Sequence, residues 1–172
     1  MSEPPAQLPK INNLASAVCR IKLAFSAGKV ADATGFLYQR YGTLWLITNW
    51  HVVSGRHAET KKLLIDQQWP ISMKYRTSVK NLPDITMATI DQEMYSPVDV
   101  PSWLVHPKFF DDVDVVAIRI PSNIHDRLNE IKNRMGANAK ISVINDSEYI
   151  RDEMDVRAMD DVAIGGYPRA LQ

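Results

Sequence analysis

The chain has 172 residues, of which 45% are hydrophobic and 23% are charged, with 20 basic and 20 acidic side chains. This length suits one domain or slightly more, and the apolar content is sufficient for a buried core. Lysine and arginine are spread along the sequence without forming a basic block, so neither nucleic acid nor an anionic membrane surface is expected as a partner. The single cysteine, Cys19, excludes an internal disulfide and favours a reducing compartment.

The N-terminus lacks the apolar segment of a signal peptide, and no apolar run approaches the ~20 residues of a membrane helix. These features predict a soluble, cytoplasmic protein that makes no contact with membranes. Residues 1–13 contain three prolines and little that could pack, so we expect them to form an extended arm.

Alternating polarity predicts a half-buried β-strand at Ala15–Phe25, with Cys19 in its apolar row. This position favours a structural cysteine over a reactive thiol. Five further short strands are expected at residues 36–39, 44–47, 71–75, 85–90 and 113–120. Six short strands separated by turns, with little helix, predict an all-β fold that forms a closed antiparallel barrel or a sandwich.

A histidine follows the apolar strand Leu44–Ile47, in the sequence Thr48-Asn49-Trp50-His51-Val52-Val53. A histidine at the exit of a buried strand, within a helix-like turn, has its backbone held from both sides. His51 is therefore well placed to be a fixed general base. The structural alternative is a partly buried histidine that only satisfies a backbone carbonyl.

Three aspartates, Asp111, Asp112 and Asp114, lie where the chain enters the strand predicted at Val113–Ile120. A buried carboxylate is costly unless it is paired or hydrogen-bonded, and an imidazole N–H is a suitable partner. The alternative is that all three carboxylates are solvated.

Beyond Ile120, apolar residues recur at helical spacing from Ile124 to Met135, between a Pro121-Ser122-Asn123 cap and Gly136. They predict an amphipathic helix docked on the strands, followed by a polar, acidic loop at Asn145–Asp155.

Residues 165–168, GGYP, lack the lysine and the helix of a phosphate-binding loop. The histidines and the cysteine have no ligand spacing, so neither a metal nor another cofactor is expected.

Two segments resemble those of the trypsin-like serine peptidases. Residues 33–56, ATGFLYQRYGTLWLITNWHVVSGR, resemble the histidine segment of the bacterial branch that includes the HtrA-like enzymes and the stand-alone trypsin-like peptidase domains. Residues 106–120, HPKFFDDVDVVAIRI, resemble the aspartate segment. The resemblance places the catalytic histidine on His51 and the catalytic aspartate on Asp114. Asp112 is the runner-up because the alanine of the motif is shifted to Ala117, and His106 is expected to be structural.

The resemblance implies the first part of a double-barrel fold. It divides the chain into an arm at 1–13, a six-stranded first barrel at 14–120, a linker with a helix at 121–158, and the first strand of a largely missing second barrel at 159–172. The nucleophilic serine of the family lies in a G-x-S-G segment, and residues 1–172 contain none.

The chain is therefore expected to be the N-terminal part of a serine endopeptidase with a polypeptide substrate, and to be inactive alone. Its own C-terminal half, or another protein, would cover the exposed face of the barrel. Two alternatives stay open: an inactive peptidase-like binding module or scaffold, and an unrelated β-barrel in which His51 and Asp114 never meet.

Overall fold

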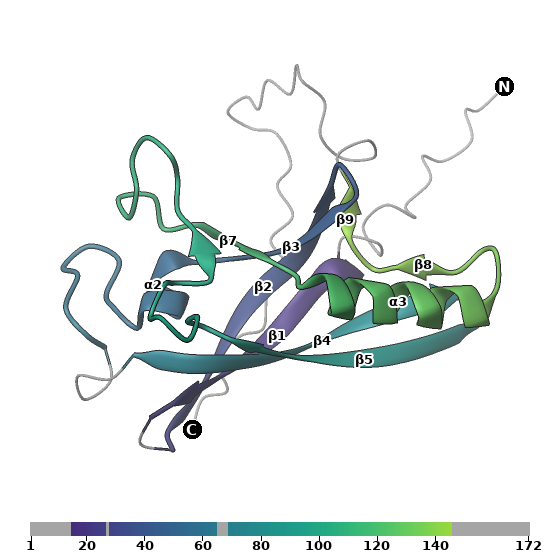
Figure 1. The fold of residues 1–172 in the computed structure, drawn as a ribbon, viewed down its shortest axis with the longest axis horizontal. Coiled ribbons are helices and arrows are strands. Elements are labelled where there is room, and N and C mark those ends of the chain that lie inside the picture. Colours follow the sequence, from purple (N-terminus) through teal and green to yellow (C-terminus); the bar gives the residue numbers. More distant parts are fainter. Residues whose placement is uncertain (1–14, 27, 65–68, 146–172) are drawn as a thin grey trace, which may run out of the picture.

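A computed structural model describes residues 15–26, 28–64 and 69–145. This part of the chain is mostly antiparallel β-sheet with little helix, which confirms the predicted fold class at that level (Figure 1). The predicted arm at 1–13, the acidic loop beyond Asn145 and the strand at 159–172 lie outside the described residues.

In chain order the elements are β1 (Val18–Phe25), β2 (Val30–Arg40), β3 (Thr43–Thr48), α2 (Trp50–Ser54), β4 (Pro70–Asn81), β5 (Asp84–Glu93), β6 (Trp103–Leu104), β7 (Val116–Arg119), α3 (Ser122–Met135), β8 (Lys140–Ile141) and β9 (Ile144–Asn145). All six predicted strands are present. The short strands β6, β8 and β9 were not predicted, because two apolar residues carry no periodicity.

The strands lie in one sheet, in the order β5-β4-β1-β2-β3-β7-β6, with β8 beside β4 and β9 beside β2. Among the described residues, β5 and β6 form the two ends of this order and do not pair, so the sheet is not closed. The chain leaves the ladder after Glu93, makes a turn at Ser96, and returns at Ser102, whose amide donates to the carbonyl of Met94 (2.9 Å).

The hairpin of β4 and β5 is much longer than expected, and its register runs from Ser72↔Glu93 to Asn81↔Asp84. The second half of β4 is mostly polar, which hid it from the sequence pattern. Thr77 and Ser78 are nevertheless buried there, beside the buried Val79.

The core lies between the inner face of the sheet and the helices. The predicted apolar row of β1 is buried throughout, and on α3 Leu128 and Ile131 are buried where the helix packs against β4 and β5. The helix predicted between the Pro121 cap and Gly136 is thereby confirmed. The other large, fully buried side chains include Leu37, Leu44, Leu46, Met73, Tyr75, Val116 and Ile118.

Two strands begin later than predicted. Residues 15–17 form a helical turn, so β1 begins at Val18 rather than at Ala15. Strand β7 begins at Val116 rather than at Val113, because the backbone carbonyl and the carboxylate of Asp114 are hydrogen-bonded to residues at the start of α2 instead of to a neighbouring strand.

Candidate functional site

The pairing of β3 with β7 brings two distant segments together. These strands are antiparallel, with Thr48 opposite Val116, so the end of β3 lies beside the start of β7. His51 comes three residues after Thr48, and Asp114 comes two residues before Val116. The topology therefore places both side chains at the same edge of the sheet, although they are 63 positions apart in the sequence.

Asp114 is held by His51 at two points. The Nδ1 atom of the His51 ring lies 2.6 Å from Oδ2, and the backbone N–H of His51 donates to Oδ1 at 2.8 Å. The 2.6 Å distance between Nδ1 and Oδ2 lies within the range of a catalytic histidine–carboxylate hydrogen bond. The same carboxylate thus accepts from one of the free amides at the start of α2 and fixes the orientation of the ring.

Asn49 adds a third support for this carboxylate. Its Nδ2 atom donates to the backbone carbonyl of Asp114 at 2.9 Å and to Oδ2 at 3.3 Å. Asn49 occupies the N-cap position of α2, but its side chain makes no capping bond to its own helix. The Asn49 side chain instead anchors the aspartate, a role that we did not predict. The polar residue directly after β3 was the signal that could have revealed it.

The hydrogen-bond roles follow from the chemistry of the two groups. An ionised carboxylate only accepts hydrogen bonds, so the Nδ1 atom of a neutral His51 must carry the proton. The lone pair of the imidazole is then on Nε2, which has no hydrogen-bond partner among the described residues. Because the His51 side chain is 39% exposed and that of Asp114 is 32% exposed, an external proton donor can reach this nitrogen. The arrangement is suited to accepting a proton.

Lys61 ties together the two loops beside this pair. Its ammonium lies 4.4 Å from the centroid of the Trp50 ring, donates to the carbonyl of Asp111 at 2.5 Å, and is 3.6 Å from the Asp111 carboxylate. Trp50 precedes His51, and Asp111 lies in the loop that leads to Asp114. We call this three-residue contact, formed by Lys61, Trp50 and Asp111, the Lys61 strap. No sequence pattern predicts this contact, because a lysine in a polar loop follows no periodicity.

The other predicted candidates make no described hydrogen bond with His51. Asp112 is exposed, and in the described residues its side chain makes no hydrogen bond with His51, so the runner-up assignment is not supported. The Nδ1 atom of His106 accepts from the amides of Lys108 and Phe109, and its ring stacks on Phe109. His106 therefore organises a turn, in keeping with the structural role expected for it.

Cys19 has no access to this site. Its side chain lies in the core at 2% exposure, and burial raises the pKa of the thiol to about 12.

Within the described ranges, no group of three or more histidine, cysteine or acidic side chains is arranged to hold a metal ion. In the same part of the chain, no helix combines the length and apolar character that a membrane span requires.

Comparison of the chain with protein-family models, with curated proteins and with solved structures finds no match to any of them.

Proposed function

We propose that this chain supplies the histidine and the aspartate of a serine endopeptidase of the trypsin-like class. The observation that carries the proposal is the hydrogen bond between His51 Nδ1 and Asp114 Oδ2. In such an enzyme, His51 would take the proton of a serine hydroxyl through Nε2 and later give it to the leaving amine. Asp114 would hold the tautomer and stabilise the imidazolium that forms.

The strand topology supports the same proposal. The sheet order places β1 between β2 and β4 and places β3 between β2 and β7, with the histidine after β3 and the aspartate before β7. We propose that β5 and β6 are two parts of one interrupted strand that completes a six-stranded barrel. Gln92, near the end of β5, donates from Nε2 to the carbonyl of Arg119 in β7 at 3.1 Å, which draws the two sides of the gap together.

The nucleophile is the missing part of this proposal. No G-x-S-G segment occurs in residues 1–172, and a histidine–aspartate pair provides neither the attacking oxygen nor the amides that bind the developing oxyanion. We propose that both come from polypeptide other than residues 1–172. The substrate would be a polypeptide, and its sequence preference would be set mainly by that other part.

The test uses covalent labelling by a serine-directed fluorophosphonate. Residues 1–172 alone should not be labelled. The chain extended by any residues encoded after Gln172 should be labelled. In that extended protein, His51→Ala should lower the labelling rate by about 10⁴-fold. The matched control, His106→Ala, should keep the labelling rate of the unsubstituted protein. Labelling of residues 1–172 alone would refute the proposal. An extended protein that folds but resists labelling would favour a binding module.

A further inference from the structure

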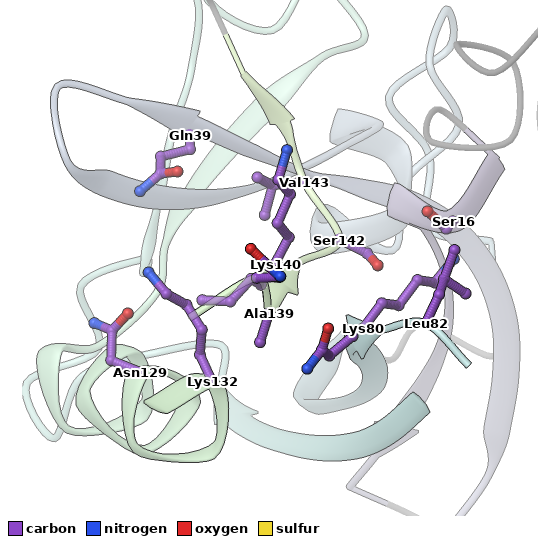
Figure 2. Close-up of a pocket in the computed structure, with 13 residues that line it drawn as sticks. Ser16, Gln39, Lys80, Leu82, Asn129, Lys132, Ala139, Lys140, Ser142 and Val143 are labelled. Carbon is purple, nitrogen blue, oxygen red and sulfur yellow. The ribbon is translucent and has the colours of Figure 1, made fainter. Parts of the chain in front are cut away.

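A pocket of about 720 Å³ lies between α3 and the edge of the sheet near β8. Figure 2 shows side chains from several elements around it, including Gln39 of β2, Lys80 of β4, Lys132 of α3 and Lys140 of β8. In Figure 1, β8 and the C-terminal end of α3 lie at the opposite end of the molecule from α2. The pocket is therefore separate from the His51–Asp114 pair.

Hydrogen bonds fix the walls of this pocket. The buried hydroxyls of Ser78 and Ser142 are 2.7 Å apart, and the Ser142 amide donates to the Ser78 carbonyl, which holds the segment after β8 against β4. On the other side, Asn81 Nδ2 donates to the carbonyl of Met135 at 2.6 Å and ties the β4–β5 hairpin to the end of α3. The lining is thus part of the folded framework and needs no large rearrangement to receive a ligand.

Two lysines of this lining lie opposite each other on neighbouring strands. Lys80 and Lys140 are directly opposed in the antiparallel pairing of β4 with β8, so their side chains leave the same face of the sheet. Like charges at opposed positions destabilise a strand pair. In the described residues neither ammonium has an ion pair or a hydrogen bond that would compensate for this repulsion.

The remaining lining increases the positive character of the pocket. Lys132 is a third lysine without a described partner, and none of the residues that line the pocket is an aspartate or a glutamate. Lys132 also lies in the last turn of α3, where the helix dipole favours a cation, so its presence has a structural explanation. The Lys80–Lys140 pair has no such structural explanation, and its opposed charges point to an anionic ligand.

The neutral side chains of the lining narrow the class of ligand. Asn129 and Asn138 present amide groups that can both donate and accept, next to the apolar surfaces of Ala139 and Val143. Such a mixture suits a compact organic molecule whose anionic group meets the lysines and whose hydroxyl or amide groups meet the asparagines. A concave pocket of this kind is a poor fit for an extended polymer, which needs a continuous groove.

We propose that this pocket binds a small molecule that carries a phosphate group, with Lys80 and Lys140 as the residues that contact the phosphate. The three lysines are separated by 52 and 8 positions in the sequence (132 minus 80, and 140 minus 132), and the fold collects them. This explains why the sequence showed no basic block. The bound phosphate would neutralise the repulsion between the opposed lysines, so ligand binding and stability are coupled at this pair.

The test combines two measurements on the same protein. Inorganic pyrophosphate is titrated into isotope-labelled protein at constant ionic strength, and amide shifts around Lys80, Asn129 and Lys140 are followed by NMR. Lys80→Gln should weaken pyrophosphate binding about tenfold. In the absence of pyrophosphate, the same substitution should raise the midpoint of thermal unfolding by about 1–2 °C, because it removes the like-charge contact. Lys140→Gln should repeat both effects.

Lys62→Gln, which changes an exposed lysine in the loop after α2, is the matched control and should alter neither quantity. Several results would overturn the proposal. They are the absence of pocket shifts up to about 10 mM pyrophosphate, an equal loss of affinity in Lys62→Gln, and a lower unfolding midpoint with unchanged affinity. An RNA oligonucleotide that binds more tightly, with shifts beyond the pocket, would also overturn it.

Discussion

Gly35 and Ile47 approach so closely that a Cβ atom on residue 35 would lie 2.7 Å from the Ile47 carbonyl oxygen. It would also lie 2.9 Å from the Ile21 side chain. Gly35 is paired with Thr48 at the end of β3, and Thr48 Oγ1 donates to the Thr34 carbonyl. The absence of a side chain at residue 35 therefore lets β2 and β3 pack closely directly before the turn that carries His51.

Gly35→Ala should lower the free energy of unfolding by about 1–3 kcal/mol, because the carbonyl of Ile47 belongs to the backbone and cannot rotate away. Urea denaturation measures this change. Gly42→Ala is an informative comparison, since Gly42 has a positive φ of 75° but no atoms within 4 Å of its Cβ position. It should cost about 1 kcal/mol through backbone strain alone. A Gly35→Ala protein as stable as the wild type would contradict the close packing described for these strands.

Asp114→Ala should destabilise the protein less than Leu46→Ala. Leu46 is fully buried, and its truncation leaves a cavity that costs about 2–5 kcal/mol. The carboxylate of Asp114 is partly exposed, so water can replace it for Asn49 and for the amide of His51 at a cost of about 1–2 kcal/mol. Denaturant melts of both variants compare these costs. A larger loss for Asp114→Ala would identify the pair as a structural ion pair.

The strand pattern and the two candidate residues could be predicted because each depends on local signals. The apolar row through Cys19, the continuous run before His51 and the aspartates before β7 are all visible in a few neighbouring positions. The contacts of Asn49 and Lys61 with the loop before β7 were not predicted, because their partners Asp114 and Asp111 lie 50 or more positions away in the sequence. The polar half of β4 was missed for a related reason. Its buried Ser78 is hydrogen-bonded to Ser142, which lies 64 positions later in the sequence.

The Cys19 thiol should not react with a disulfide reagent such as DTNB at pH 8 until the protein unfolds. It is 2% exposed, and its pKa is raised to about 12 by burial. In the unfolded chain the thiol titrates near its usual pKa of about 8.5. The native state therefore binds more protons between these two values, and stability falls as pH rises through this range. Below pH 8 the thiol makes no contribution to the pH dependence.

Cys19→Ala should weaken this alkaline loss of stability, although burial also raises the pKa of Tyr75, which will continue to contribute. The slope of the unfolding free energy against pH, measured from pH 8 to pH 11, gives the comparison. Rapid DTNB reaction with the folded protein, at a rate independent of denaturant, would show that the core beside Cys19 opens without unfolding.

The Lys61 strap should hold the loop that carries Asp114 against α2. Lys61→Met keeps the aliphatic stem but removes the charge that contacts the Trp50 ring and the Asp111 carbonyl. We expect a loss of about 0.5–1.5 kcal/mol in global stability, because the side chains of Lys61 and Asp111 are partly exposed.

The larger effect of Lys61→Met should be local. Amide hydrogen exchange at Asp112 and His51 should accelerate, since the Asp112 amide donates to the Phe109 carbonyl within this loop and the His51 amide is protected by a carboxylate that the loop positions. Amides of the β4–β5 hairpin should change only by the amount that the global stability changes. Lys62→Met, in the neighbouring exposed residue, is the control and should leave exchange at His51 unaltered. If Lys61→Met accelerates exchange equally throughout the sheet, the lysine stabilises the fold in general and does not position Asp114.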